Sequence, residues 1–373
     1  MNNPPSSTAK LAIFLSTSGH SGVDRVMKNL IPEIAQRGVQ VDLLKVKNHG
    51  PYLESVPHDV NVIELGSKHT YTSLFPLVRY LKTNRPDALL SDKDKVNRVA
   101  LIAAKLAGAT TKVSVRNGTT VSIDLKKRGW LDQKLHYFSM HSLYRRAHAI
   151  LVPSQGSADD LAQVANIPAG RVTAVPSPAA TAELFSKAKA NVEHSWFQDK
   201  QNPVIIGVGE LSPRKDFATL VRAFAQVRQQ RACRLFILGK GKQQKNLEAL
   251  IEELNIEQDV TLAGFDDNPY RYMARADLYV HSSRFEGSPV ALMEAVALGT
   301  PCVSTDCPSG PRETLQNGRY GKLVPVGDAN AMAAAIVESL ENPMPREEVK
   351  KAAAPFTVEA SATAYLNALG INQ

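Results

Sequence analysis

Short apolar runs bounded by turn residues alternate along this chain with longer segments whose apolar residues recur about every 3.6 positions. The first pair is "LAIFLS" at 11–16 and "VDRVMKNLIPEIAQRG" at 23–38, which ends at a glycine. Apolar runs of strand length that alternate with amphipathic helices are typical of βαβ units around a parallel sheet. Further runs ("VQVDLLKV", "DALLSD", "TKVSVR", "AILVPS") continue the pattern to residue 154, so it predicts a complete doubly wound α/β domain.

A second series of the same kind begins after residue 200. Its strand-like runs are "PVIIGVG", "RLFILG", "VTLAGF", "ADLYVHSS" and "PCVSTD", with helical segments between them. We therefore predict an α/β protein with two doubly wound, Rossmann-like domains. The active site of such a pair is expected near the carboxyl ends of the strands, in a cleft between the domains.

The domain boundaries follow from the breaks in this pattern. The stretch 175–203 is rich in Pro, Ser, Ala and Asn and has no sustained period, which indicates a linker. We expect an N-terminal domain at 1–180, a linker at 181–202 and a C-terminal domain at 203–350. The pattern at 351–373 is helical; it does not say which domain the helix packs on, and we expect it to cross back to the N-terminal domain.

Composition narrows the class of protein. The 373 residues are 43% hydrophobic, and no run reaches the roughly 18 apolar residues of a membrane span. The N-terminus has no cationic segment followed by an apolar core, so we expect no secretion signal. Three cysteines (Cys233, Cys302 and Cys307) fit neither a paired zinc motif nor a disulfide framework. We expect a soluble protein in the cytoplasm.

Positive charge is concentrated in the first half of the chain. Residues 1–180 hold 23 Lys and Arg against 13 Asp and Glu, whereas 181–373 hold 21 against 23. The densest basic stretch, 126–146, suits a membrane surface, an anionic lipid-linked acceptor or nucleic acid; the alternative is an amphipathic helix with a solvated basic face. Its basic and aromatic residues are Lys126, Lys127, Arg128, Lys134, Arg145 and Arg146, interleaved with Trp130, Tyr137, Phe138 and Tyr144.

The stretch "RFEGSPVALMEAVALGTP" at 284–301 carries carboxylates in an otherwise apolar setting. Because it follows a strand-like run, Glu286 is expected in a strand-to-helix turn, where free N–H groups suit an anionic or polyhydroxylated ligand. Ser288 is the expected N-cap, Pro289 suits the first helical position, and Gly299 ends the helix.

Glu294 lies about a turn and a half into that helix, with apolar residues on both sides. A carboxylate amid apolar surface needs a hydrogen-bonding partner, because burying it alone is costly. The pattern leaves three interpretations open: the side chain binds a ligand, points to solvent, or pairs with a structural arginine.

Other turns carry glycines and cations. "GVGELSPRKDF" at 207–217 places Arg214 and Lys215 ahead of an amphipathic helix, which suits a diphosphate; the alternative is a capped loop with solvated cations. "LGKGKQQKN" and "TDCPSGPRETL" are similar turns. In the loop "STSGHSGVDRV", Gly22 lets the backbone approach a ligand, and His20 either contacts phosphate or acceptor or takes no part.

The spacing from Glu286 to Glu294 is the E-x7-E motif of retaining glycosyltransferases of the GT-B fold, specifically glycosyltransferase family 4. Residues 276–328 resemble that family almost throughout, and the likeness extends more loosely back to the loop near residue 20. The resemblance implies that Glu286 holds a hydroxyl of the donor sugar, that Glu294 binds the ribose, and that Lys215 neutralises the leaving diphosphate. It makes Lys215, Arg214 and Glu286 the catalytic candidates. The donor-binding candidates are Glu294, Gly287, Ser288, Pro289, Gly209, Gly239, Lys240, Phe265 and Gly22.

The sequence departs from the family in two places. The usual arginine partner of Lys215 is replaced by Glu210, so we expect Arg214 to do its work from a neighbouring position. Many members also carry a histidine in the first domain, where this chain has "RNGTTVS". The candidates to replace it, or to bind the acceptor, are His20, Arg116, Asn117 and Thr119.

The resemblance implies transfer, with retention, of a hexose or N-acetylhexosamine from a nucleotide diphosphate sugar to a hydroxyl of a glycan or lipid-linked acceptor. Family frequency favours a UDP-sugar and a role in cell-envelope polysaccharide, lipopolysaccharide or glycolipid synthesis. We expect no cofactor and no metal, because the one look-alike of an Asp-x-Asp motif, "SDKD" at 91–94, lies in the wrong domain. The expected location is cytoplasmic, with peripheral contact at the inner face of an anionic membrane.

Two other classes of function stay open. One is a GT-B nucleotide-sugar epimerase or phosphorylase. The other is a basic module that binds nucleic acid or membrane, although the complete donor constellation in the second half argues against a nucleic-acid partner.

Overall fold

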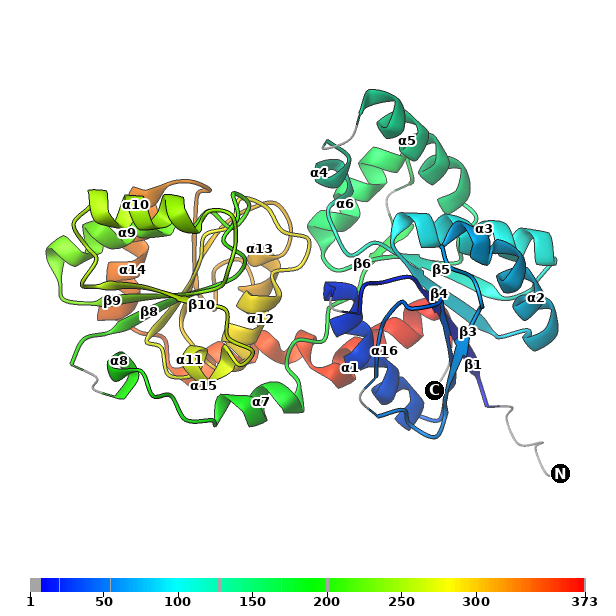
Figure 1. The fold of residues 1–373 in the computed structure, drawn as a ribbon, viewed down its shortest axis with the longest axis horizontal. Coiled ribbons are helices and arrows are strands. Elements are labelled where there is room, and N and C mark those ends of the chain that lie inside the picture. Colours follow the sequence, from blue (N-terminus) through cyan, green and yellow to red (C-terminus); the bar gives the residue numbers. More distant parts are fainter. Residues whose placement is uncertain are drawn as a thin grey trace. The chain divides into compact units, whose positions relative to one another are not determined.

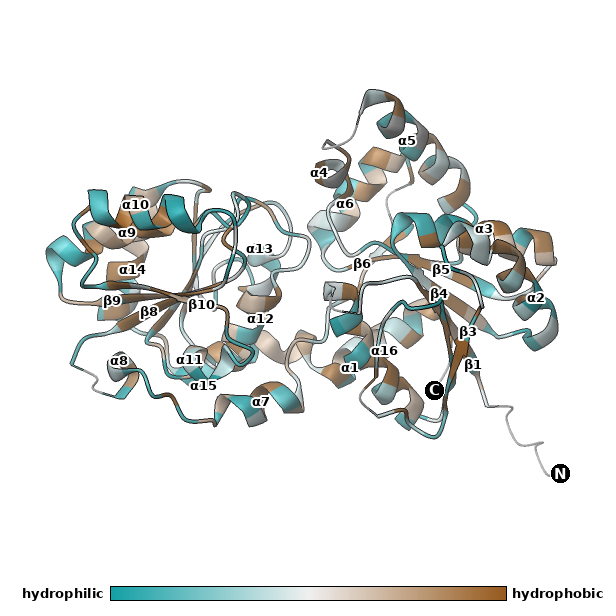
Figure 2. Cartoon of the chain, viewed as in Figure 1, coloured by the Kyte–Doolittle hydropathy of each residue, from teal (hydrophilic) through white to brown (hydrophobic). Residues whose placement is uncertain are grey.

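The chain folds into two α/β units, shown in a computed structural model that describes residues 8–19, 21–53, 55–126, 129–168, 170–198 and 201–371 (Figure 1). Unit 1 comprises Met1–Pro178 together with Val358–Gln373, and unit 2 comprises Ala179–Thr357. In both units the strands are mainly hydrophobic, whereas the helices carry both hydrophobic and hydrophilic residues, as Figure 2 shows. The predicted fold class, two Rossmann-like domains, is confirmed.

Unit 1 is built on a parallel sheet whose described strands run in the order β3-β2-β1-β4-β5-β6-β7. The order reverses between β1 and β4, the topological switch point of a doubly wound sheet. Helices α1 (Gly22–Gln36) and α16 (Val358–Leu369) pack on one face, and α2, α3, α5 and α6 pack on the other. The strands are β1 (Lys10–Leu15), β2 (Gln40–Lys45), β3 (Val60–Glu64), β4 (Ala88–Asp92), β5 (Lys112–Arg116), β6 (Ile150–Val152) and β7 (Val172–Ala174). The other helices of this unit are η1 (Tyr71–Ser73), α2 (Leu74–Asn84), α3 (Asp94–Ala107), α4 (Val121–Lys126), α5 (Trp130–Tyr144) and α6 (Gln155–Ala165).

Unit 2 repeats this architecture with described strands in the order β10-β9-β8-β11-β12-β13, again all parallel. Two apolar clusters, one of which contains residues of α9 and α14 and the other residues of α12, pack with the sheet. The strands are β8 (Val204–Val208), β9 (Arg234–Leu238), β10 (Val260–Gly264), β11 (Leu278–His281), β12 (Cys302–Thr305) and β13 (Lys322–Val324). The helices are α7 (Ala182–Ala188), α8 (Ser195–Gln198), α9 (Phe217–Gln230), α10 (Gln244–Glu253), α11 (Tyr270–Met273), α12 (Val290–Ala297), α13 (Pro311–Thr314), α14 (Ala329–Glu341), α15 (Arg346–Lys350) and η2 (Lys351–Phe356).

The segment 181–202, expected to be a linker, instead belongs to unit 2. It contains α7 and α8, and its Leu184 and Phe197 are buried in the same apolar cluster as Phe236. The rings of Phe197 and Phe236 meet edge to face with their centroids 5.2 Å apart. A few well-placed aromatic contacts thus order a segment that has no sustained apolar period.

The end of the chain divides between the units. Residues of α15 and η2 remain in unit 2, whereas α16 packs against α1 of unit 1. The return to unit 1 therefore begins at Val358, later than the expected 351.

A buried ion pair at the strand ends of the unit 1 sheet is hydrogen-bonded to α16. The Arg116 guanidinium, at the end of β5, donates to the Asp92 carboxylate at the end of β4, and its Nε donates to the Tyr365 hydroxyl of α16 at 2.6 Å. All three side chains are buried. Burial raises the pKa of Asp92 even though Arg116 opposes the shift, so the charge of this carboxylate depends on its partner.

Removing the cation from this pair should destabilise the protein. Because Arg116→Met leaves a buried carboxylate without its counter-charge, we expect a loss of about 3–5 kcal/mol in the free energy of unfolding. Urea unfolding followed by circular dichroism measures it, with Arg79→Met, at an exposed cation of α2, as the control. The double variant Arg116→Met/Asp92→Asn should recover part of the loss. A cost for Arg116→Met no larger than that of Arg79→Met would contradict this role.

Candidate active site

The turns that follow β8 and β11 meet at the carboxyl edge of the unit 2 sheet. These strands are neighbours, with Leu278 paired to Ile205. The Arg284 N–H donates to the Arg214 carbonyl at 2.8 Å, and the Ser282 hydroxyl donates to the Lys215 carbonyl at 2.8 Å. The two backbones are thereby fixed to each other, although their residues are about 70 positions apart in the sequence.

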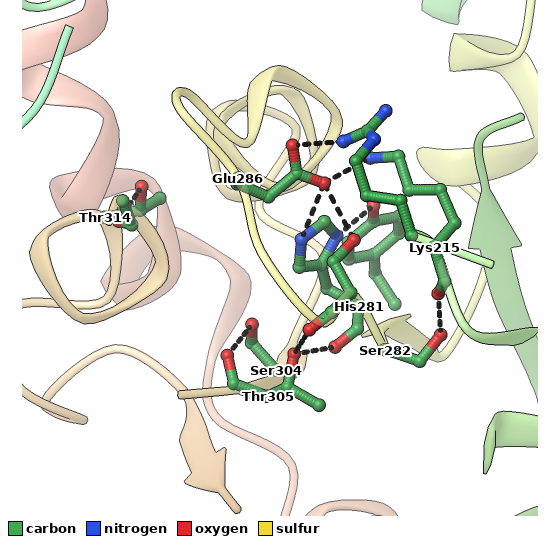
Figure 3. Close-up of polar contacts among 11 residues, drawn as sticks. Lys215, His281, Ser282, Glu286, Ser304, Thr305 and Thr314 are labelled. Atoms are coloured by element: carbon green, nitrogen blue, oxygen red, sulfur yellow. Dashed lines mark hydrogen bonds and ion pairs between the residues drawn. The ribbon is translucent and has the colours of Figure 1, made fainter. Parts of the chain in front are cut away.

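The Glu286 carboxylate is the centre of this site. It accepts hydrogen bonds from Lys215 Nζ at 2.7 Å, from Arg214 Nη1 at 2.6 Å and from Ser283 Oγ at 2.7 Å. Figure 3 shows it facing Lys215 and His281, with Ser304 and Thr305 on the neighbouring strand. The structure thus brings the three catalytic candidates into direct contact.

Charge and burial oppose each other at Glu286. The residue is only 5% exposed, and burial alone would disfavour its ionised form. The positive charge of Lys215, with that of Arg214, outweighs burial and holds the pKa of Glu286 below its usual range. The carboxylate is therefore an anion at neutral pH.

His281 is a member of this cluster that sequence reasoning missed. It ends β11, is 2% exposed, and its Nε2 lies 3.6 Å from Glu286 Oε1, too far for a hydrogen bond. Its ring stacks on Tyr279. Burial, together with the charge of Lys215, lowers the pKa of His281 to about 3, so the imidazole is neutral. A polar residue at the end of an apolar strand, just before the Ser282–Glu286 turn, is the only sequence signal that could have found it.

The second carboxylate, Glu294, is buried inside α12 with 3% of its surface exposed. It accepts a hydrogen bond from the Tyr270 hydroxyl at 3.2 Å. The interpretation in which this side chain points to solvent is therefore wrong. Pro269, which precedes Tyr270 in the chain, lines a pocket at the ends of β8 and β9, so Glu294 is linked to that pocket through α11.

The start of α12 differs in detail from the prediction. The N-cap is Pro289 and the helix begins at Val290, one residue later than expected. The N-cap is therefore not Ser288, whose hydroxyl donates to the Met293 sulfur at 3.8 Å. The predicted C-terminus is confirmed: the helix ends at Ala297, and Gly299 adopts a positive φ of 74°.

A pocket of about 290 Å³ lies at the ends of β8 and β9, and its lining residue Gly209 packs against the Lys215 side chain. Four of the donor-binding candidates line it: Gly209, Gly239, Lys240 and Phe265. Glu210, Asp266 and other residues at the ends of β8, β9 and β10 complete the lining. A Cβ at Gly239 would lie 1.8 Å from the Gly209 carbonyl oxygen, so only glycine allows these two strand ends to pack this closely. The Lys240 amino group lies 5.8 Å from the centre of the exposed Phe265 ring.

The structure does not bring the candidates of the first domain together into one cluster of side chains. Arg116, expected near the acceptor, is instead held in the buried pair with Asp92, and Asn117 is buried and accepts a hydrogen bond from Tyr144 at 3.3 Å. Both side chains are thus engaged within unit 1, and whether either binds the acceptor stays a prediction. Thr119 is exposed in the following turn, Gly22 opens α1 with free space where a Cβ would be, and His20 lies outside the described residues.

The carboxylates of "SDKD" both face cations: Asp92 pairs with Arg116, and Asp94 pairs with Arg98 and with His136 at 2.8 Å. Across the described residues, no three His, Cys, Asp or Glu side chains form a group that could hold a metal ion. Whether the reaction needs a metal stays a prediction.

None of the helices in the described ranges has the length and apolarity needed to cross a bilayer.

Comparison with known proteins identifies the family. The model of the glycosyl transferases group 1 matches residues 189–355, and that of the glycosyl transferase 4-like domain matches residues 21–178. The N-acetylgalactosamine-N,N'-diacetylbacillosaminyl-diphospho-undecaprenol 4-alpha-N-acetylgalactosaminyltransferase of Campylobacter jejuni is 30% identical over 353 residues, which are 92% of this chain and 93% of the relative.

Two solved structures share the whole fold. Anabaena HepE in complex with UDP superposes with a TM-score of 0.77 at 18% identity, covering 97% of this chain and 99% of HepE. The lipopolysaccharide outer core galactosyltransferase WaaB superposes with a TM-score of 0.76 at 20% identity, with the same coverage.

The family models and the Campylobacter relative show that the chain is a glycosyltransferase, and its paired Rossmann-like units give it the GT-B fold. Within that class, the chain belongs to the glycosyl transferases group 1, glycosyltransferase family 4.

The neutral state of His281 predicts a dependence of stability on pH. In the unfolded chain the histidine pKa is near 6.5, whereas in the folded protein it is depressed. Above pH 6.5 the imidazole is neutral in both states and the folded protein keeps its full stability. As the pH falls from 6.5 towards 3, only the unfolded chain takes up the proton, so the free energy of unfolding falls. Wild type should lose stability relative to His281→Leu by up to about 1.4 kcal/mol per pH unit in that window.

Urea unfolding at a series of pH values between 7 and 4.5 measures this difference. The control is His58→Gln, whose wild-type side chain is almost fully exposed and whose replacement should leave the slope unchanged. Parallel pH curves for wild type and His281→Leu would rule out a buried neutral imidazole.

Proposed function

We propose that the protein transfers a hexose or N-acetylhexosamine, with retention of anomeric configuration, from a UDP-sugar to a hydroxyl of a glycan or lipid-linked acceptor. The observation that carries this proposal is the convergence of Lys215 and Arg214 on Glu286, beside a pocket of about 290 Å³. Two cations suit the diphosphate of a sugar donor, and a carboxylate between them suits the sugar hydroxyls.

In this proposal Lys215 and Arg214 stabilise the charge that grows on the leaving diphosphate. Cations that are held in place before the reaction stabilise such charge more than cations that must be rearranged. Arg214 supplies the second charge from its own position, because the family resemblance implies an arginine where this chain has Glu210, a residue that lines the pocket.

The nucleoside is proposed to occupy the pocket at the β8 and β9 ends. The exposed ring of Phe265 offers a surface on which a base can stack, and Lys240 lies over that ring. Glu294 is proposed to bind the ribose, with the backbone of Gly287 and Ser288 close to the sugar. The HepE structure, which contains UDP, supports uridine as the nucleoside.

Retention is proposed to arise by substitution on one face of the sugar. The bond from the anomeric carbon to the diphosphate breaks, the acceptor oxygen bonds to the same face, and the acceptor proton passes to the departing phosphate oxygen. The alternative is a double displacement with Glu286 as nucleophile. We favour the first route because three hydrogen bonds already engage the Glu286 carboxylate and reduce its nucleophilicity.

The acceptor is proposed to bind to unit 1. This unit carries 23 Lys and Arg against 14 Asp and Glu, which suits an anionic substrate such as a lipid-linked diphosphate. The name of the Campylobacter relative specifies an acceptor on diphospho-undecaprenol, which supports this class. We propose a role in cell-envelope polysaccharide, lipopolysaccharide or glycolipid synthesis.

The surface of α5 supports peripheral contact with an anionic membrane. Its Trp130, Leu131 and Phe138 are 68%, 63% and 72% exposed. Lys134 lies 4.2 Å from the centre of the Trp130 ring, and the exposed Arg145 and Arg146 follow the helix. Lys127 and Arg128 lie outside the described residues. Exposed aromatics beside cations match the interface of an anionic bilayer.

The catalytic assignment predicts separate kinetic effects for two variants. Lys215→Met should lower kcat about 10²- to 10³-fold while leaving the fold intact, because one preorganised charge is lost. Glu294→Gln should chiefly raise the KM for donor. Release of UDP from UDP-sugars, with and without acceptor, measures both, and Lys245→Met at an exposed position of α10 is the control.

The same assay separates the rival enzymes. A transferase releases UDP slowly until acceptor is added, an epimerase consumes donor without acceptor, and a phosphorylase requires inorganic phosphate. Unchanged kinetics in both Lys215→Met and Glu294→Gln would refute the assignment, and an inverted product in early NMR spectra would refute retention.

The membrane proposal predicts binding to vesicles of mixed phosphatidylglycerol and phosphatidylcholine. Trp130→Ser/Phe138→Ser should weaken sedimentation with these vesicles about tenfold or more, because each exposed ring loses apolar burial in the interface. Phe185→Ser, at an exposed ring of α7 in unit 2, is the matched control. Binding of duplex DNA at a series of salt concentrations tests the nucleic-acid alternative, for which the affinity should fall steeply as the salt concentration rises. Equal binding of the double variant and wild type would refute the assignment to α5.

A further inference from the structure

Both cations proposed to bind the diphosphate already have a counter-ion within the protein. The ion pairs of Lys215 and Arg214 among the described residues end on the same carboxylate, Glu286, at 2.7 and 2.6 Å. The cations remain partly accessible, with 12% and 33% of their side chains exposed, whereas the carboxylate is almost fully buried. A phosphate that approaches Lys215 and Arg214 therefore meets two positive charges, one of which is already offset by the Glu286 carboxylate.

We propose that Glu286 is an internal competitor of the diphosphate for Lys215 and Arg214, and that this competition weakens the binding of the nucleoside diphosphate product and promotes its release. The inference rests on the proposed function, because it assumes that these cations receive the diphosphate of the donor.

The carboxylate is fixed where it competes. Ser283 donates to Glu286 Oε1 at 2.7 Å, and the backbone bond from Arg284 to Arg214 holds the turn that carries the acid against the turn that carries the cations. His281 lies against the same oxygen but is buried and neutral, so it adds no charge to the balance. A ligand anion must then share the cations with Glu286, because burial and three hydrogen bonds hold the carboxylate in place.

The Glu286 carboxylate weakens the binding of the product more than the binding of the donor. In the donor, the terminal phosphate is esterified to the sugar and carries one charge. When the bond to the sugar breaks, the phosphate oxygen takes the acceptor proton, which it releases near neutral pH, since the second pKa of such a phosphate is about 6. The product therefore carries an additional negative charge beside the Glu286 anion. Two like charges that share the same pair of cations in a partly buried site repel each other more strongly than they would in water.

The test compares the affinity of full-length variants for UDP and for inorganic pyrophosphate by titration calorimetry. Glu286→Gln keeps the size of the side chain and removes its charge, and it should bind both probes about tenfold tighter or more. Its UDP dissociation rate, followed by stopped flow, should fall by a similar factor. Glu286→Asp keeps a carboxylate and should bind UDP much as wild type does. Glu210→Gln removes an exposed carboxylate near the same pocket and should have a smaller effect.

The outcomes separate this inference from the proposed function. If wild type binds UDP but a folded Glu286→Gln binds it equally or more weakly, the competition is refuted and the donor assignment stands. If neither wild type nor Glu286→Gln binds UDP or pyrophosphate, the proposed function fails and the inference fails with it. Glu286→Ser is a second neutral variant for the case in which glutamine disturbs folding, and it should also bind UDP more tightly than wild type.

Discussion

The parallel pairing of β8 with β11 is the constraint on which the candidate site depends. These strands are adjacent in the sheet although five elements separate them in the sequence, and their carboxyl ends open on the same edge. The turn after one supplies cations, and the turn after the other supplies the anion that binds them. Two hydrogen bonds that involve backbone carbonyls then fix the turns together, so the geometry of the charges follows from strand register and not from local sequence.

Each unit contains a buried carboxylate paired with an arginine near the carboxyl ends of its strands. The two pairs differ in how much of the arginine side chain is exposed. The Arg116 side chain is enclosed with Asp92 and Tyr365, so its charge is used within unit 1. Arg214 remains open to solvent above Glu286 and can exchange partners. The same pair of residue types is thus structural in one unit and available to a ligand in the other, because desolvation of the cation is complete only in the first.

The sequence predicted the fold class well because strand and helix periods are local properties. It also located Glu286, Lys215 and Arg214, since strand-to-helix turns of a doubly wound sheet lie on one edge. It failed where long-range packing decides the outcome: 181–202 is ordered by aromatic contacts with distant strands, and Arg116 is buried by a helix almost 250 residues away. His281 was missed because the apolar strand does not reveal that the turn after it folds back and places Glu286 against the imidazole.

The position of α16 has a consequence for how the protein is made. This helix covers the face of the unit 1 sheet that also packs α1, and its Tyr365 completes the hydrogen bonding of a buried guanidinium. On the ribosome, residues 8–178 emerge long before 358–371, and unit 2 is synthesised between them. During that interval the α16 binding face of unit 1 is uncovered, and the second domain has time to fold first. Unit 1, although its sheet is synthesised first, is thus completed last.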